Sequence, residues 1–198
     1  MLSLLFTLYL KMLVLYSPFF VLSCFIGLTP GYSVKERKKL AWKVALGTLI
    51  SSVLLYLFGK AIFEIFGITA DAVRIGAGSV LFISALGMAQ GKSAVQADNV
   101  QQDVTIVPLT IPLTVGPGTI GALLVMGISQ PAWDDKLAAI LAIAIASATV
   151  GLVLFLSDKV ERLLGQQGLQ ILSRLMGLFV CALAAQIIFT GIQGYLQP

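Results

Sequence analysis

The sequence predicts an all-α membrane protein with six transmembrane helices, arranged as two inverted three-helix repeats in which helices 1 and 4 are interrupted at mid-membrane. Three observations predict this fold: too few charges for a soluble domain, six long apolar segments, and an internal repeat. Of the 198 residues, 58% are apolar and 11% are charged, whereas a soluble domain has roughly 25% charged residues. Residues 1–198 are therefore expected to form a single transmembrane domain in contact with the lipid bilayer.

Six apolar segments are each long enough to cross a bilayer, which takes about 20 helical residues for a hydrocarbon core about 30 Å thick. They cover residues 4–28, 40–59 with an amphipathic tail to 67, 72–91, 104–129, 136–157 and 167–195. Polar stretches are expected to connect them at 29–39, 67–71, 91–103, 129–136 and 157–168. Strict alternation of apolar and polar residues is missing from the sequence, which favours helices over a transmembrane barrel.

The basic residues predict the orientation. One side of the membrane would carry Lys35, Arg37, Lys38, Lys39, Lys43, Lys92, Lys159, Arg162 and Arg174, and the other only Lys60, Arg74 and Lys136. Because positive charge marks the cytoplasmic side, both termini are expected outside, in a multi-pass protein of the plasma membrane, or of the inner membrane in a Gram-negative cell. The basic run at 35–39 is then interpreted as a topology anchor, and no nucleic-acid partner is expected.

The chain also repeats itself. At an offset of 100 residues, Arg74 aligns with Arg174 and Gly91 with Gly191. The expected boundaries are about 1–91 for the first repeat, 92–103 for a loop and 104–198 for the second repeat. Since each repeat has an odd number of crossings, the second repeat must insert upside down relative to the first.

Prolines well inside the apolar segments predict two helix breaks. Pro18 in the first segment pairs with Pro112 in the fourth at an offset of 94, and Pro117 follows. Irregular backbone at this depth survives only when it is buried in protein or lines a watered cavity. A single proline kink often binds nothing, but corresponding breaks in both halves indicate a midplane binding site. The candidate substrate-binding residues are Ser17, Pro18, Ser23, Pro112, Thr114, Gly116, Pro117, Gly118 and Thr119.

The charges restrict the solute that such a site could hold. All nine Asp and Glu residues fall in loops or at segment ends, so none is placed for a proton relay at the midplane. A solute held by helix N-termini, free carbonyls and hydroxyls is expected to be small and neutral or zwitterionic. A zwitterion suits the site best, because its carboxylate can face a helix N-terminus and its ammonium can face freed carbonyls.

Three basic residues in or beside the segments have more than one interpretation. Lys11 lies about ten residues into the first segment, where it could snorkel to the headgroups, follow an interfacial stretch at 1–9, or take part in function. Arg74 and Arg174 are interpreted first as structural residues that fix equivalent helix starts, and second as solute contacts.

Catalysis finds little support in the sequence. His is absent, which excludes His-based triads and His-ligated metals, and Cys24 and Cys181 lie in apolar runs as small buried residues. A Ser-Lys pair would need Lys11 beside Ser17 or Ser23, but six residues separate Lys11 from Ser17, so the two side chains would not meet on one helix. We therefore expect no enzyme activity, cofactor or metal.

Four stretches of the chain resemble the MarC family of prokaryotic membrane proteins, and together they cover nearly its whole length. They are GLTPGYSVKERKKLAWK, FGITADAVRIGAGSVLF, IVPLTIPLTVGPGTI and SRLMGLFVCALAAQIIFTGI. The resemblance implies six helices in two inverted repeats, a plasma-membrane location and, for some members, transport of glycine- or alanine-sized solutes.

The first repeat departs from the family pattern, which is close to Asp-Pro-x-Gly-Asn-x-Pro. Residues 17–23 read Ser-Pro-Phe-Phe-Val-Leu-Ser, whereas the second-repeat motif is intact at Pro112, Gly116, Pro117 and Gly118. The leading hypothesis is a secondary transporter or exporter of a small neutral or zwitterionic solute. The alternative is a non-transporting membrane scaffold or assembly protein that retains the fold, and formation of a homo-oligomer is left open.

Overall fold

The structure is a computed structural model that describes residues 2–91, 110, 114–129 and 133–196. Its helices are α1 (Leu2–Tyr16), α2 (Pro18–Leu28), α3 (Val34–Phe66), α4 (Ala70–Ala89), α5 (Pro117–Ser129), α6 (Trp133–Phe155) and α7 (Ser157–Leu196). Five described stretches are long and apolar enough to cross a membrane: Leu2–Leu28, Val34–Gly59, Ala70–Ala89, Trp133–Phe155 and Ser157–Leu196. A shorter apolar helix, Gly118–Ile128, lies in the fourth expected segment. The all-helical fold class is thus confirmed within the described ranges.

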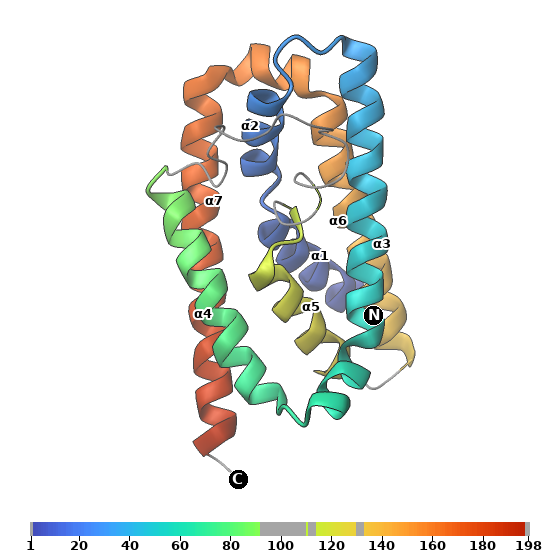
Figure 1. The fold of residues 1–198 in the computed structure, drawn as a ribbon, viewed down its shortest axis with the longest axis vertical. Helices are drawn as coiled ribbons and strands as arrows, with labels where there is room; N and C mark the ends of the chain where they lie inside the picture. Colours follow the sequence, from blue (N-terminus) through green and yellow to red (C-terminus); the bar gives the residue numbers. More distant parts are fainter. Residues whose placement is uncertain (1, 92–109, 111–113, 130–132, 197–198) are drawn as a thin grey trace.

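The two interrupted helices lie between two helix pairs (Figure 1). α4 packs against α7 on one side of the bundle, and α3 packs against α6 on the other. Between them, α1 contacts α6, α2 contacts α7, and α5 contacts both α3 and α4. α3 and α7 run in one direction, while α4 and α6 run in the opposite one. The turns at 29–33 and near 156–165 therefore lie at one end of the bundle, and the turn at 67–69 lies at the other.

α3 begins at Val34, earlier than the expected start at residue 40, because a capping box starts it. The Ser33 N–H and hydroxyl donate to Glu36 Oε2 at 2.8 and 2.7 Å, and the Glu36 N–H donates to Ser33 Oγ at 3.3 Å. The basic run at 35–39 therefore forms the first turns of a helix, and the prediction of a connecting loop there was wrong.

The stretch 157–168 is likewise helical where the sequence predicted a connection. Val160 and Leu164 pack against the core one turn apart, which gives this polar stretch an apolar face. α7 is interrupted at Gly165, whose φ of 64° is in the region that favours glycine. The chain therefore turns at this glycine instead of in a longer loop.

Arg37 joins three elements at this end of the bundle. Its Nη1 lies 2.8 Å from Asp158 Oδ1 and 3.5 Å from Glu161 Oε2, both near the start of α7. Its Nη2 donates to the Thr29 carbonyl after α2 at 3.2 Å. Its side chain is only 15% exposed, so this member of the basic run also has a structural role.

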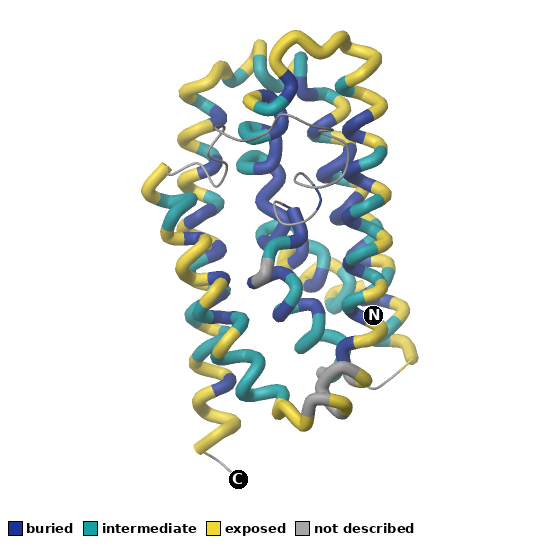
Figure 2. The backbone as a smooth tube through the Cα atoms, viewed as in Figure 1, coloured by how far each residue is buried: buried dark blue, intermediate teal, exposed yellow. Residues whose placement is uncertain are grey.

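The core follows the interrupted helix α1–α2 and the inner faces of its neighbours (Figure 2). Ala138, Ala142 and Ala146 form a fully buried stripe on α6. On the same helix, a Cβ placed on Gly151 would lie 2.6 Å from Ala45 Cβ of α3. Small residues thus allow the helix backbones to approach closely, which is how helices associate in lipid.

Residues that the sequence aligns at an offset of 100 contact each other where α4 and the turn after it pack against α7. A Cβ on Gly191 would lie 2.9 Å from Arg74 Cβ, and a Cβ on Gly91 would lie 2.7 Å from Arg174 Nη2. Each arginine therefore meets the glycine of the other aligned segment.

Replacing Gly177 by Ala should lower the free energy of unfolding by about 1–3 kcal/mol, the usual cost of overpacking. A Cβ at this position would lie 2.6 Å from the Ala89 backbone N and 3.0 Å from the Ala85 carbonyl O of α4. Gly87→Ala is the matched control, because a Cβ there meets nothing within 4 Å, and it should be neutral or stabilising. Unfolding in detergent compares the two variants, and equal stabilities would contradict the close α4–α7 packing.

Candidate functional site

A single residue, Ser17, separates α1 from α2 at the first predicted break. Its φ of 46° and ψ of 62° are left-handed, and it is the only non-glycine residue with positive φ in the described part of the chain. Its hydroxyl donates to the Val14 carbonyl at 2.8 Å, and its N–H donates to the carbonyls of Leu13 and Val14. Pro18 then takes the first position of α2, where a missing N–H removes a group that would have had no helical acceptor.

The second break also places a proline at the first position of a helix. The Val115 N–H donates to the Thr110 carbonyl at 2.8 Å in a wide turn, and α5 then begins at Pro117. Pro117 is therefore the structural counterpart of Pro18. The two prolines are 99 residues apart, which is close to the offset of 100 between Arg74 and Arg174. Pro112, which the sequence pairs with Pro18, lies outside the described residues.

The half-helices α2 and α5 begin near the middle of the bundle and run away from each other (Figure 1). The first turn of a helix has N–H groups without an acceptor inside the helix. Some of these groups donate to the carbonyls of Ser17 and Gly116. Three others have no acceptor among the described residues: the N–H groups of Phe19, Gly118 and Thr119. The positive ends of two helix dipoles thus lie in the interior.

Buried hydroxyl groups lie on the elements around the two breaks. Tyr16, the last residue of α1, donates to Ser52 Oγ of α3 at 2.8 Å. Near the breaks, the hydroxyl oxygens of Thr48 and Thr110 are also buried and have no hydrogen-bond partner within the described ranges. Thr110 faces α3, because a Cβ on Gly47 would lie 2.9 Å from its Oγ1. A buried hydroxyl without a partner is costly, so a solute or water that bonded to it would be stabilised.

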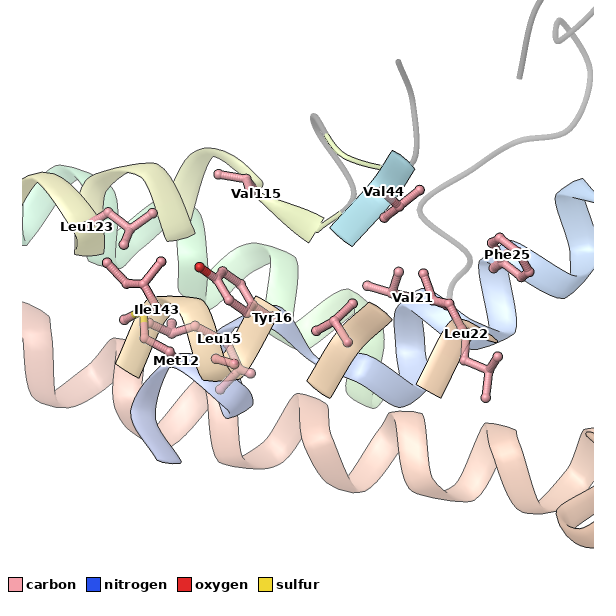
Figure 3. Close-up of a cluster of buried hydrophobic side chains, with 14 of the residues drawn as sticks. Met12, Leu15, Tyr16, Val21, Leu22, Phe25, Val44, Val115, Leu123 and Ile143 are labelled. Carbon is pink, nitrogen blue, oxygen red and sulfur yellow. The ribbon is translucent and has the colours of Figure 1, made fainter. Parts of the chain in front are cut away.

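Buried, largely apolar side chains lie close to both breaks. Tyr16 ends α1, Val21 and Leu22 lie beyond the break on α2, and Val115 precedes α5 (Figure 3). All four side chains are almost completely buried. The low local dielectric strengthens any hydrogen bond that a solute makes here.

The structure places several predicted site residues at the breaks. Ser17, Thr114 and Thr119 are buried, and Gly116 is half-buried just before α5. Ser23 is an exception, because it lies further along α2 and lines a separate cavity. Most of the described predicted residues therefore lie at one of the two breaks, whereas Ser23 does not.

Gly118 approaches another helix closely. The sequence makes Gly118 a candidate substrate-binding residue, but a Cβ on Gly118 would lie 2.6 Å from Leu81 Cα of α4. A Cβ on Gly121 would likewise overlap Ala77 Cβ. The missing side chain at Gly118 is therefore explained by packing between α5 and α4.

A cavity of about 260 Å³ lies between α1, α4, α5 and α7. Most of its wall is apolar, and its polar lining residues are Lys11, Arg74, Gln186 and Thr190. Leu15, two residues before Ser17, is also part of its wall. We call this space the Lys11 cavity.

A second cavity of about 120 Å³ lies between α2, the end of α4 and α7, and Arg174 lines it together with Ser23. Each of the repeat-related arginines therefore lines one of the two cavities. Arg74 lies near the start of α4, as predicted, and its Nη1 is 2.5 Å from Asp71 Oδ1. Arg174 does not lie near a helix start, because α7 resumes directly after Gly165. The prediction of a helix-start position was wrong for Arg174.

Sequence reasoning missed the hydroxyl groups that α3 and α6 contribute. Thr48, Ser52 and Ser147 are each almost fully buried. The available signal is a small polar residue inside an otherwise apolar span, as in TLISSVL and ASATV. Such residues often bond to their own helix, so the pattern alone does not assign them to a site.

The described acidic side chains do not form a metal site. No group of three or more His, Cys, Asp or Glu side chains that could hold a metal ion occurs within the described ranges. Asp71 is paired with Arg74, and Asp158 is paired with Arg37. The chemistry of the breaks is therefore that of N–H groups and hydroxyls.

Replacing Ser17 by Gly should leave the protein more stable than replacing it by Ala, by about 1 kcal/mol. Both variants lose the hydroxyl bond to the Val14 carbonyl, so the difference reports the left-handed backbone, which glycine adopts without strain. Chemical or thermal unfolding of the two variants measures it. An Ala variant as stable as the Gly variant would contradict this backbone geometry.

Comparison with known proteins agrees with a multi-pass membrane protein. A family model described as "MarC family integral membrane protein" matches residues 2–196. A UPF0056 membrane protein of Methanocaldococcus jannaschii is 34% identical over 187 residues, covering 91% of each chain. A second, from Pyrococcus abyssi, is 32% identical over 94% of this chain and 93% of its own length, and YhcE of Escherichia coli is 28% identical over 96% and 92%. No solved structure matches the chain. The chain belongs to the MarC family of integral membrane proteins.

Proposed function

We propose that this protein is a secondary transporter or exporter that moves a small neutral or zwitterionic solute, such as a small neutral amino acid, across the plasma membrane. The observation that carries the proposal is the pair of half-helices, α2 and α5, whose N-termini lie in the bundle interior. The free N–H groups of their first turns can donate to a carboxylate, which the helix dipoles also favour. Interrupted helices of this kind form the solute sites of several secondary transporters.

The proposal includes two inverted repeats, the first formed by α1 to α4 and the second by residues 110 to 196. The helix contacts support this plan, because α5 corresponds to α2 and their contacts exchange with the repeats. The contact of α5 with α4 becomes that of α2 with α7, and the contact of α5 with α3 becomes that of α2 with α6. The pairs α3–α6 and α4–α7 each map onto themselves. Inverted repeats allow the site to open alternately to either side of the membrane.

The groups at the breaks suit a zwitterion. A carboxylate can accept hydrogen bonds from the N–H groups of Phe19, Gly118 and Thr119. An ammonium group can donate to the hydroxyl oxygen of Thr48, which has no partner among the described residues. Charges of both signs would then be balanced without a buried acidic or basic side chain.

The orientation follows from the basic residues. Lys35, Lys38 and Lys39 are exposed at the end of the bundle where α3 begins. We place this end in the cytoplasm because positive charge accumulates there. Both termini then lie outside, and the proposed activity is transport without catalysis.

A non-transporting scaffold or assembly protein is the second candidate. Phe20 and Val21 stand where the family pattern has Gly and Asn, and Val21 and Leu22 are fully buried. This half of the site is bulkier and less polar than the resemblance implies. Loss of the solute site with retention of the fold would explain that change.

Gly116→Leu should abolish uptake or efflux of a labelled small neutral amino acid by the purified protein in liposomes. Gly116 lies just before α5, so a leucine side chain would fill the space that a solute needs beside the helix N-terminus. Leu152→Ile is the control, because Leu152 is 58% exposed on α6 and its replacement should leave transport unchanged.

Thermal unfolding with the same solutes separates the two candidates. A solute that binds the folded protein stabilises it by about 2.7 kcal/mol at a hundred times its dissociation constant. If no small neutral amino acid raises the unfolding midpoint at millimolar concentration, and Gly116→Leu loses only stability, the transporter is contradicted and the scaffold is supported.

A further inference from the structure

Lys11 lies within the stretch Leu2–Leu28, which is long and apolar enough to cross a membrane. The sequence leaves three interpretations of this lysine open, namely snorkelling, an interfacial position and a functional role. The structure places it on the wall of the Lys11 cavity, with Arg74 of α4 and Gln186 of α7 also on that wall. The side chain of Lys11 is exposed on this wall, so its position can be explained by the cavity as well as by the lipid headgroups.

The charges around this cavity do not balance. Arg74 is paired with Asp71, with 2.5 Å between Nη1 and Oδ1. Lys11 forms no ion pair with any carboxylate of the described residues, and none of the described residues that line the cavity is acidic. One positive charge is therefore left uncompensated on its wall.

An uncompensated cation at membrane depth is costly. A water-filled cavity reduces that cost, and an anion beside the ammonium group would reduce it further. The rest of the wall is apolar and includes Leu8, Met12, Leu183 and Ile187. The complementary ligand is therefore a compact molecule with one carboxylate and a short apolar part.

We propose that the Lys11 cavity is the entrance to the solute site and that the Lys11 ammonium group binds the carboxylate of the incoming solute there. The inference rests on the proposed function, and it narrows the substrate class to solutes that carry a carboxylate. The volume of about 260 Å³ corresponds to about nine water molecules, which is enough for a small amino acid or a short-chain carboxylate. Leu15, which lines the cavity, lies on α1 two residues before the first break at Ser17.

The experiment measures the charge preference of the cavity without requiring transport. Gln186→Cys supplies a reporter thiol on the cavity wall, in a background in which Cys24 and Cys181 are replaced by Ala. Its labelling rate is measured with two methanethiosulfonate reagents of similar size, one carrying a sulfonate and the other a trimethylammonium group. Phe189→Cys is the matched control, because Phe189 is on the same helix, is 65% exposed and does not line the cavity.

The expected result is that the thiol at position 186 reacts faster with the sulfonate reagent, whereas the thiol at position 189 shows no such preference. Lys11→Gln should reduce the ratio of sulfonate to trimethylammonium rates about tenfold, because a positive charge on the same cavity wall attracts the sulfonate and repels the trimethylammonium group. Lys11→Arg should retain the ratio. A ratio that Lys11→Gln leaves unchanged would overturn the proposal, even if solute transport is observed.

A second arm separates a solute carboxylate from a lipid headgroup. Sodium butanoate should slow sulfonate labelling at position 186 in vesicles of phosphatidylcholine alone, whereas butylammonium chloride should not. If protection instead requires phosphatidylglycerol in the vesicle and butanoate has no effect, the cavity holds an anionic lipid and the proposal is wrong. Because labelling needs no transport, a failure of the proposed function leaves this result interpretable.

Discussion

Inside a membrane, backbone N–H and C=O groups cannot form hydrogen bonds to water, so they must find partners within the protein. The rest of this structure depends on that constraint. Continuous helices satisfy it along α3, α4 and α6, so the two breaks need special provision. Each half-helix opens with a proline, which removes a donor that would otherwise be open, and Ser17 bonds back to the last turn of α1 through its hydroxyl and N–H. Among the described residues, a small set of first-turn N–H groups has no hydrogen-bond acceptor. The proposed solute site consists of these N–H groups and the buried hydroxyls nearby.

The helix pair α4–α7 relates this site to the two cavities. Its reciprocal contacts hold Arg74 against Gly191 and Arg174 against Gly91. Each arginine also lines a cavity, and the two cavities differ in volume, about 260 and 120 Å³. The same helix pair therefore positions both arginines and forms part of the wall of both cavities.

Much of the fold could be predicted from the sequence because length, hydropathy and proline position act locally. The all-helical class, the breaks at Ser17 and before Pro117, and the alignment of Arg74 with Arg174 all follow from such patterns. Contacts between distant segments could not be predicted in this way. The neighbour of Gly118 is Leu81 of another helix, so a glycine pattern that suits ligand binding proved to serve helix packing. The helix at 157–164 was also missed, because its polar residues are typical of a connecting loop. Its stability depends on distant partners, since Asp158 and Glu161 pair with Arg37 and Val160 packs against the core.

The central claim is that the helix breaks present free N–H groups to a watered space inside the membrane. Residue-resolved hydrogen exchange of the protein in lipid nanodiscs tests it most directly, because exchange needs both an open N–H group and access to water. The account predicts that the amides of Phe19, Gly118 and Thr119 exchange orders of magnitude faster than that of Ala146 in the continuous, buried part of α6, and that a bound solute slows them. Exchange as slow as that of Ala146 at all three amides would contradict the account.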